Sequence, residues 1–575
     1  MQAIGALWQA GAAPDWRAMQ PAEPPRRVPL PGYPFARNRH WLAPAATPRP
    51  AMARPALALL DWRYAEPLHP PAGLAVALHG GEPALREGLA AALAGHGARV
   101  LMWDGSLPPP PADRLVVLEP GFDAMLDLAA GLAGRHGGGL RVVTRHAQDA
   151  EAATELEAAR LAAALASAGQ ELPELGLRQI DLGGPLSRRQ LAALAAECLA
   201  DGPAGVLLRD GRRRLPAIAE LEPAAAAEPW LESQVTLITG GFGRVGQAFA
   251  RRLAARPGAR LVLLGRQVPA GDDPRLLELR ALGAEVLALA GDIAADGVAH
   301  AAVQAALGRF GRLDCVIHAA GVAGEAAHRP LLECGRAERA AIQAAKLDGT
   351  RRLAAALDGV AVRRVLLCSS LSTVLGGLGF AAYAAGNRAL EVLAERQSRD
   401  GAQWLALGYD GWHFDGDPPA TGPALAAAEA IALTERALAA GLAGRVLLSA
   451  GRLAERLARW QAVAESAEAA APAAAATAFV AADHYADPAE AAVAQAIADT
   501  LALAAVGPDD DFFALGGDSL VATRVIARLR GATGLPLSVG LVLQAPTVRL
   551  LAAAVRAMQG LPAAEASDEY EEGAL

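Results

Sequence analysis

The sequence of 575 residues contains little cysteine and no long apolar run. Its four cysteines stand singly, without a Cys-X-X-Cys pair or a suitable histidine spacing, so neither a disulfide framework nor a bound metal is expected. No run of about 18 apolar residues occurs, which argues against a membrane span. The first residues lack the basic and apolar regions of a signal peptide, and we therefore expect a soluble protein of the cytoplasm.

An excess of positive charge is also absent. Lys and Arg number 53 against 61 Asp and Glu, which leaves a formal net charge of −8 at pH 7. This balance argues against nucleic acid as a partner. Hydrophobic residues make up 53% and charged residues 20%, as in folded proteins. A chain of this length is expected to divide into roughly two to four domains.

Residues 51–232 alternate short apolar strands with alanine-rich helices, a pattern that predicts an α/β fold. The first strand ends at His79-Gly80-Gly81 and lacks the glycine spacing that seats a pyrophosphate. We therefore expect a Rossmann-like fold that cannot bind a nucleotide. Residues 1–50 are rich in proline and are interpreted as a linker, which is anchored on a neighbouring domain by Tyr33, Phe35 and Trp41.

A second α/β pattern covers residues 233–465 and opens with a strand, a glycine-rich turn and a helix, in that order. Glycines there let the backbone approach a pyrophosphate, whose charge is favoured at a helix N-terminus. The next strand ends at Arg266, where NAD-binding folds usually carry an acidic residue. An arginine favours the 2′-phosphate of NADPH, and a solvated surface arginine is the alternative. The predicted cofactor-binding residues are Thr239, Gly240, Gly241, Gly243, Gly246, Arg266, Asp292, Ala319, Ala320 and Gly321.

Arg244 stands at the start of the helix that follows the glycine-rich turn. Its side chain either adds a second contact to the cofactor phosphate or is solvated. The sequence leaves both possibilities open.

Four polar residues of this second half suit the reduction of a ketone. Tyr383 and Asn387 are four residues apart on one helix face, Ser370 ends a strand, and Lys346 lies on the preceding helix. Hydride transfer creates an alkoxide, which needs a proton and hydrogen bonds aimed at the forming charge. We expect Tyr383 to supply the proton and Ser370 to orient the carbonyl group. We also expect the Lys346 ammonium to stabilise the Tyr383 phenolate and Asn387 to hold a water.

These residues resemble the ketoreductase domains of modular polyketide synthases, within the short-chain dehydrogenase/reductase superfamily. Most of that superfamily has a lysine four residues after the tyrosine. Here Asn387 fills that position and Lys346 stands where the asparagine is expected, an exchange typical of polyketide ketoreductases. The resemblance implies a structural subdomain at 51–232 and a catalytic subdomain at 233–465.

The same resemblance implies that residues 1–50 are the linker that follows an acyltransferase. The chain is then the C-terminal part of a synthase module, with ketosynthase and acyltransferase domains upstream or on another chain. Two family markers of hydroxyl configuration are missing: Ala323-Gly324-Glu325 replaces a Leu-Asp-Asp motif, and Leu375 stands where the other class has tryptophan. The stereochemical outcome therefore stays open. Residues 410–430 are expected to form a mobile lid over the substrate.

An Ala/Pro linker at 466–485 precedes residues 486–557, which predict a small helical bundle. The motif Gly516-Gly517-Asp518-Ser519 opens a helix, where a phosphodiester is favoured and where serine also serves as an ordinary cap. The motif is similar to the attachment site of acyl and peptidyl carrier proteins, so Ser519 is expected to carry 4′-phosphopantetheine, added by a phosphopantetheinyl transferase. The helix has one apolar stripe, formed by Ala522, Val525, Ile526 and Leu529.

The acidic tail, residues 558–575, is either a docking motif for a downstream synthase or synthetase subunit or a solvated end. Together the patterns predict two Rossmann-like α/β subdomains, one degenerate and one NADPH-binding, followed by a helical carrier domain. The predicted function is NADPH-dependent reduction of a carrier-bound β-ketoacyl thioester to a β-hydroxyacyl thioester. The alternatives are a catalytically silent ketoreductase-like scaffold beside a carrier domain and a stand-alone dehydrogenase of a small metabolite.

Overall fold

The computed structural model describes most of the chain between residues 55 and 559. The chain divides into two units, Met1–Met52 and Ala53–Leu575, and all the described helices and strands belong to the second. The aromatic residues of the predicted N-terminal linker, nearly all of the Ala/Pro linker and the acidic tail lie outside the described residues. The described residues are 10, 11, 13, 15, 55–134, 139–148, 154–222, 234–322, 327–398, 402–417, 423–458, 485, 487–501, 503, 505–517 and 519–559.

Two sequence expectations concern membranes and metals. Among the described residues, no helix is long and apolar enough to cross a bilayer. The same residues contain no group of three or more His, Cys, Asp or Glu side chains that could hold a metal ion. The four cysteines are buried and form no disulfide with one another, and burial raises the pKa of Cys198 to about 12, which keeps this thiol protonated.

The second half of the chain forms seven parallel strands with an apolar core on each face. A strand that is covered on both faces buries successive side chains and not only alternate ones. In Val235–Thr239, for example, all five residues are buried. The strands are β9 (Val235–Thr239), β10 (Arg260–Gly265), β11 (Glu285–Ala290), β12 (Cys315–His318), β13 (Arg364–Ser370), β14 (Gln403–Tyr409) and β17 (Gly444–Ser449). Their order is β11-β10-β9-β12-β13-β14-β17. The strand order reverses between β9 and β12, and open α/β sheets bind ligands at the carboxyl edge of such a point.

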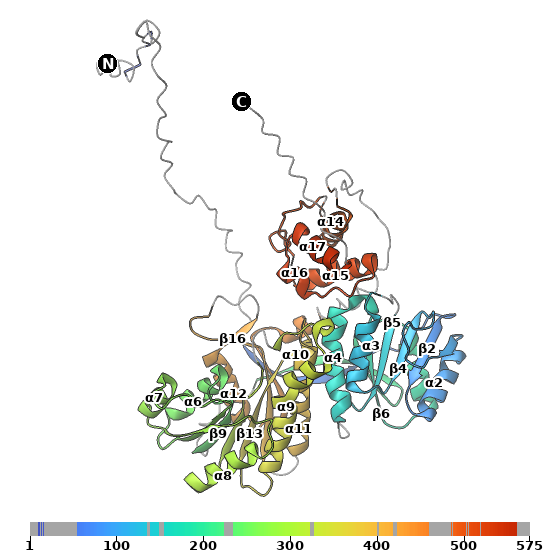
Figure 1. Ribbon diagram of the computed structural model, residues 1–575. Coiled ribbons are helices and arrows are strands. Elements are labelled where there is room, and N and C mark those ends of the chain that lie inside the picture. The colour runs from blue at the N-terminus through green and yellow to red at the C-terminus, as the bar shows by residue number, and fades with distance from the viewer. Residues whose placement is uncertain are drawn as a thin grey trace. The chain divides into compact units, whose positions relative to one another are not determined.

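The first half of the chain repeats this architecture (Figure 1). Its parallel strands are β2 (Ala75–Gly80), β3 (Arg99–Met102), β4 (Arg114–Leu118), β5 (Gly139–Arg145), β6 (Arg178–Gly183) and β7 (Gly205–Arg209). Its helices are α2 (Pro83–Gly95), α3 (Phe122–Leu132), α4 (Leu156–Glu171) and α5 (Arg188–Leu199). The predicted α/β pattern of this half is therefore confirmed.

One strand, β1 (Ala56–Tyr64), joins the two halves. It pairs antiparallel with β17 on one side and with β8 (Arg212–Leu221) on the other. These 15 strands consequently form one sheet, which continues from β17 through β1, β8, β7, β6, β5, β4 and β2 to β3. Two further strands, β15 (Gly411–His413) and β16 (Ala424–Ala426), form a separate parallel pair. The fold class is confirmed, and the structure adds that the two Rossmann-like subdomains share a single sheet.

The helices of the second half connect its parallel strands. They are α6 (Arg244–Ala254), α7 (Pro274–Ala281), α8 (Val298–Phe310), α9 (Arg336–Ala356), α10 (Ser372–Leu375), α11 (Ala381–Gln397) and α12 (Ala427–Ala439). Helix α6 is amphipathic: Phe249 and Leu253 are buried against the sheet, whereas Arg251 on the opposite side is exposed. Helix α4 of the first half packs against α11 of the second, so the halves also meet in the helical layer.

The carrier segment forms the predicted helical bundle. Its helices are α14 (Pro488–Leu501), α15 (Ser519–Thr533), α16 (Gly540–Gln544) and α17 (Val548–Gln559). The predicted apolar stripe of α15 is confirmed, because Ala522, Val525, Ile526 and Leu529 are all buried in one core. Phe512 joins this core, and a Cβ atom on Gly517 would lie 2.4 Å from its ring, so the motif glycine makes room for the phenylalanine.

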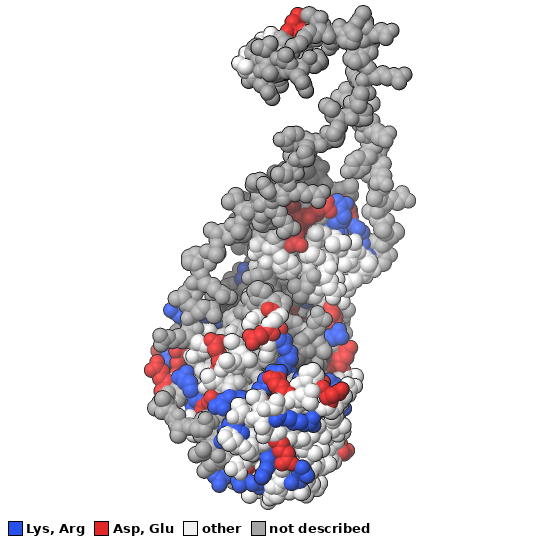
Figure 2. Space-filling model, turned by 90° about the vertical axis from the view of Figure 1, so that its left-hand side faces the viewer, with Lys and Arg blue, Asp and Glu red and all other residues white. Residues whose placement is uncertain are grey.

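Charged residues of both signs are interspersed on the face shown in Figure 2. Many surface pairs resemble Arg251 and Glu278, which lie 2.8 Å apart with side chains that are about half exposed. Such pairs contribute little to stability because water screens them. A cluster of three charged residues lies inside the first half. Glu197 of α5 is buried and accepts hydrogen bonds from Arg178 at 2.7 Å and Arg213 at 2.6 Å.

We expect Glu197→Ala to lower the free energy of unfolding by about 3–5 kcal/mol, because it leaves two buried guanidinium groups without their carboxylate. The matched surface variant Glu278→Ala should change it by about 0–1 kcal/mol. Chemical denaturation followed by circular dichroism measures both. Equal effects of the two variants would contradict this account of the buried cluster.

Candidate active site

The glycine-rich turn lies between β9 and α6, at the carboxyl edge of the sheet. Gly240 has φ +69°, and a Cβ atom on it would lie 2.7 Å from the backbone nitrogen of Ala320. A Cβ atom on Gly246 would lie 2.3 Å from the carbonyl oxygen of Gly240. The turn is therefore closely packed and admits only glycine at these positions. Its backbone forms a cradle at the N-terminus of α6, and this cradle fits the pyrophosphate of a dinucleotide.

Two further predicted cofactor residues follow neighbouring strands. Arg266 comes directly after β10 and Asp292 two residues after β11, and both are exposed. Because β9, β10 and β11 are parallel, both residues lie at the same edge as the glycine-rich turn. Gly265 allows the ring of Phe242 to rest on the end of β10, since a Cβ atom there would lie 2.6 Å from that ring. The turn and the arginine position are thus adjacent.

The sequence left open whether Arg244 contacts the cofactor phosphate or is solvated, and 59% of its side chain is exposed. Its guanidinium donates to Asp417 at 2.5 Å and lies 4.2 Å from the centre of the Phe414 ring. Both partners belong to the described part of the segment predicted to be a lid. Arg244 therefore ties the mouth of the nucleotide turn to that segment.

Thr239 has a role that the sequence did not indicate. It was predicted to bind the cofactor, but its buried hydroxyl lies 2.6 Å from Nδ1 of His318. Nε2 of His318 lies 3.1 Å from the carbonyl oxygen of Ala345, which can only accept. Burial, and then the charge of Lys346, lower the pKa of His318 to about 3, so the ring is neutral and Thr239 donates to Nδ1. This chain of bonds joins β9, β12 and α9 beneath the nucleotide turn.

Three of the four predicted catalytic residues lie together. Ser370 ends β13, and Tyr383 and Asn387 lie on consecutive turns of α11. Burial is the largest influence on the phenol and raises the pKa of Tyr383, whereas hydrogen bonds with Asn387 and Ser370 act in the opposite direction. Asn387 donates to the backbone carbonyl of Tyr383 at 2.9 Å. Its buried Oδ1 atom has no hydrogen-bond partner among the described residues, so it can accept from a water or a ligand.

Lys346 lies beside this group and contacts the end of β13. Its buried amine donates to the carbonyl oxygen of Cys368, two residues before Ser370. Its Cε atom lies against Gly321, where a Cβ atom would be only 2.8 Å away. The expectation that the Lys346 ammonium stabilises the Tyr383 phenolate stays a prediction. The pKa of Tyr383 is raised because burial dominates, and the ammonium is directed at Cys368.

Two groups that support the site were missed by the sequence reasoning. The Phe380 ring lies 5.4 Å from the Tyr383 ring and 4.2 Å from the His328 ring, centre to centre. Ser369 donates to the buried carboxylate of Glu391 at 2.6 Å, which ties β13 to α11. The spacing of eight residues between Tyr383 and Glu391 indicates that both lie on one helix face. No sequence pattern, however, indicates that Ser369 donates a hydrogen bond to Glu391.

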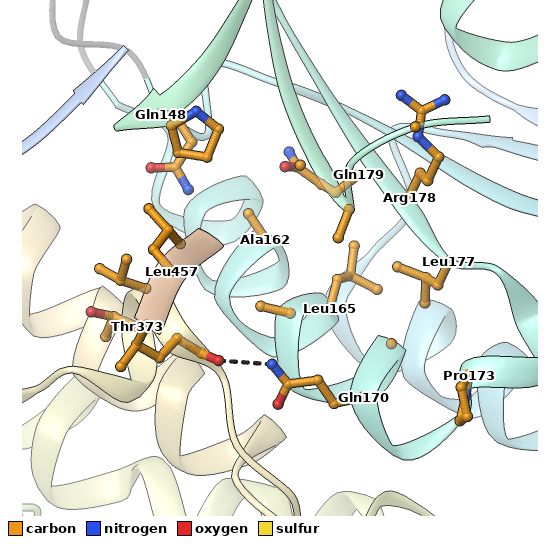
Figure 3. A pocket seen from close by; sticks show the side chains of 18 of the residues that line it. Gln148, Ala162, Leu165, Gln170, Pro173, Leu177, Arg178, Gln179, Thr373 and Leu457 are labelled. Carbon is orange, nitrogen blue, oxygen red and sulfur yellow. Dashed lines mark hydrogen bonds between the residues drawn. The ribbon is translucent and has the colours of Figure 1, made fainter. Parts of the chain in front are cut away.

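A pocket lies between α4, the β6–β7 edge and the segment Thr373–Leu375 (Figure 3). None of the four predicted catalytic residues lines it. The four predicted catalytic residues therefore lie outside this pocket.

Comparison with known proteins identifies the two parts of the chain. Residues 234–413 match the KR domain family, and residues 491–555 match the phosphopantetheine attachment site family. The relative Erythronolide synthase EryA3 of Saccharopolyspora erythraea is 30% identical over 98% of this chain. This chain carries a ketoreductase domain and a phosphopantetheine carrier domain. It spans 18% of the length of that relative.

Solved structures agree with the assignment of the ketoreductase domain. PlmKR1, a ketoreductase from the first module of phoslactomycin biosynthesis in Streptomyces sp. HK803, is 26% identical with a TM-score of 0.61. The similarity covers 71% of this chain and 96% of that one. The first ketoreductase of the tylosin PKS is 23% identical with a TM-score of 0.60, over 71% of this chain and 95% of that one, and supports the fold.

The close packing of the turn gives a test of the nucleotide site. We expect Gly240→Ala to weaken NADPH binding by about tenfold or more, because the positive φ and the contact with Ala320 cost roughly 1–3 kcal/mol. Gly258→Ala is the matched control, since this glycine also has a positive φ of +72° but lies in the loop between α6 and β10, at the opposite edge of the sheet, with nothing within 4 Å of an added Cβ atom. Isothermal titration calorimetry on folded variants measures both. Equal losses would contradict the proposed cradle.

Proposed function

We propose that the chain reduces a β-ketoacyl thioester, carried on a phosphopantetheine arm at Ser519, to the β-hydroxyacyl thioester with NADPH. The observation that carries this proposal is the grouping of Ser370, Tyr383 and Asn387 at the sheet edge that also holds the glycine-rich turn. The ketoreductase domain and the carrier domain occur in one chain, which matches a substrate delivered on a carrier.

The cofactor would lie along the carboxyl edge from β11 to β13. The turn from Gly240 to Gly246 holds the pyrophosphate, Arg266 faces the 2′-phosphate, and the small residues Ala319–Gly321 let the nicotinamide approach the backbone. Asp292 lies at the adenine end. When bound, NADPH supplies a hydride to the carbonyl carbon of the substrate.

Tyr383 holds the proton that completes the reduction. Burial raises the pKa of this phenol, so it is protonated at neutral pH and can donate. As negative charge develops on the substrate oxygen, the hydroxyls of Ser370 and Tyr383 both donate to it, and Tyr383 then transfers its proton. The carbon gains the hydride and the oxygen gains the proton, which gives the alcohol. Oδ1 of Asn387 is available to hold a water that returns a proton to Tyr383.

Lys346 has a positioning role in this scheme. Its amine fixes the carbonyl of Cys368 and thereby the end of β13, from which Ser370 projects. Burial lowers the Lys346 pKa from its ordinary value, and the pairing with a carbonyl offsets part of the cost of burying the ammonium. All four predicted residues are present and buried or half-buried at the site, which argues against a catalytically silent scaffold.

The remaining assignments concern the wider assembly. Ketosynthase and acyltransferase domains would build the β-ketoacyl chain upstream, and a phosphopantetheinyl transferase would modify Ser519. A downstream synthase or synthetase subunit would accept the product, with the acidic tail at 558–575 as its docking segment. Of the two stereochemical markers, Ala323-Gly324-Glu325 lies outside the described residues, and Leu375 is buried in α10, so no configuration is proposed.

Replacing the proposed proton donor should stop the reaction. We expect Tyr383→Phe to lower kcat for NADPH oxidation with a soluble β-ketothioester by about 10²–10⁴-fold, with little change in KM. Tyr409→Phe is the matched control: this buried tyrosine also loses a hydrogen bond, at 2.7 Å to Thr434, but lies outside the site. Full activity of Tyr383→Phe would overturn the assignment.

The carrier function is tested separately. Helix α15 begins at Ser519, and a phosphopantetheinyl transferase with coenzyme A should add one arm to the wild-type chain. Intact-protein mass spectrometry should detect no addition to Ser519→Ala, whereas Ser538→Ala, elsewhere in the carrier domain, should be modified fully. Both variants should reduce a soluble β-ketothioester at the wild-type rate. Modification of Ser519→Ala would contradict the proposed attachment site.

A further inference from the structure

The chain between Ser370 and Tyr383 contains a second glycine-rich turn, whose backbone is intrinsically flexible. It passes through α10 and then through Gly376, Gly377 and Gly379, whose φ angles are +69°, +133° and +74°. Glycine adopts such angles without strain but also loses the most conformational freedom on folding. The relative positions of the two catalytic hydroxyls therefore depend on what holds this turn from outside.

Gln170, near the end of α4, binds one side of the turn. Its Nε2 donates to the carbonyl oxygen of Leu375 at 2.7 Å, and its Oε1 accepts from the backbone nitrogen of Gly377 at 2.7 Å. Figure 3 shows the amide of Gln170 extending from α4 toward the segment that carries Thr373. The donor and acceptor of one amide thus match one donor and one acceptor of the turn. A Cβ atom on Gly376 would lie 2.8 Å from Nε2 of Gln170, so the contact is also closely packed.

Glu171, the next residue, binds the other side of the turn. Its Oε1 accepts from the backbone nitrogen of Gly379 at 3.0 Å, and its Oε2 accepts from that of Leu331 at 2.6 Å. Leu331 begins the short helix η3 (Leu331–Glu333). The carboxyl group is buried, with 2% of the residue exposed, and burial raises the pKa of Glu171 to about 7. Two adjacent side chains therefore make four hydrogen bonds to backbone of the other half of the molecule.

The held turn supports Tyr383 directly. It ends at Phe380, whose ring packs between the rings of His328 and Tyr383. The backbone nitrogen of Arg329 donates to the carbonyl oxygen of Gly379 at 2.9 Å, which joins the turn to the segment that leads to Leu331. Movement of the turn would therefore move the ring on which Tyr383 rests.

We propose that Gln170 and Glu171 are positioning residues for the reduction: from the half of the sheet without a nucleotide turn, they hold the Leu375–Gly379 segment and so set Tyr383 against Ser370. This proposal rests on the proposed reductase function and deepens it. The degenerate half then contributes to catalysis through these two side chains, in addition to its structural role.

The test compares Gln170→Ala with Gln190→Ala in the full chain. Gln190, in α5, donates to the carbonyl oxygens of Gly183 and Leu208 and accepts from Gly211, all within the first half. Both variants lose a glutamine side chain with several backbone hydrogen bonds, half-buried at Gln170 and buried at Gln190, so both should lower the melting temperature. Only Gln170→Ala should lower kcat for a soluble β-ketothioester, by about 10–100-fold, because misplacing a reacting group by about 1 Å has an effect of that order. The KM for NADPH should be unchanged, since the turn at Gly240 is untouched.

Glu171→Gln provides a second variant that keeps the size of the side chain. Its amide nitrogen cannot accept from a backbone N–H, so one of the two hydrogen bonds is lost. We expect Glu171→Gln to have a kcat between those of the wild type and Gln170→Ala. We also expect its amide hydrogens in the segment 375–380 to exchange faster than those of the wild type. Gln190→Ala should leave this exchange at the wild-type rate.

The outcomes separate the two proposals. A wild-type chain that does not reduce any β-ketothioester overturns the proposed function, whatever the exchange rates are. An active wild type with equal kcat for Gln170→Ala and Gln190→Ala overturns the positioning role. Slow exchange of segment 375–380 in Gln170→Ala would do the same, because the turn would then be held without this residue.

Discussion

The pairing of β1 with β17 and β8 is the constraint on which the rest of the molecule depends. Antiparallel hydrogen bonds from Ala56–Ala58 reach β17, and those from Leu57–Tyr64 reach β8. Because one strand is shared, the two halves cannot turn independently, and α4 is held against α11. The side chains at the end of α4 can then contact the turn that leads to Tyr383. Without this strand, the packing of helices such as α4 and α11 would still join the two halves, but the continuous sheet would be lost.

Local patterns predicted much of the fold and part of the site. The glycine-rich turn was readable because a strand, closely spaced glycines and a helix follow one another within a few residues. The stripe on α15 and the shared face of Tyr383 and Asn387 were readable from helical spacing alone. Each of these features is formed by residues that lie close together in the chain. The local sequence is therefore enough to predict it.

Contacts between distant segments were not predictable in the same way. The sequence does not show which strand of the second half pairs with β1. This pairing joins segments far apart in the chain, and no repeating sequence pattern marks it. His318 follows an apolar strand pattern, and nothing nearby indicates that Thr239 donates to it. The direction of the Lys346 amine was also missed, because spacing placed the lysine near the site without showing that the Cys368 carbonyl would bind it.

Burial determines the electrostatics of the site more than the neighbouring charges do. It raises the pKa of Tyr383 and lowers those of Lys346 and His318, so each of these groups is shifted toward its neutral form. A neutral phenol is a proton donor and a neutral imidazole is a fixed hydrogen-bond acceptor. In the proposed reaction, the site would thus give a proton to an oxygen anion and would not bind a substrate anion through a permanent charge.

The shared strand also limits how the ketoreductase can be divided. A fragment that begins at β9 would leave β17 with a free row of backbone N–H and C=O groups on the side where β1 lies in the intact chain. Unpaired apolar edges of this kind associate with one another and lead to aggregation. An excised or transplanted catalytic half would therefore need to carry β1 with it, although more than 150 residues separate that strand from β9.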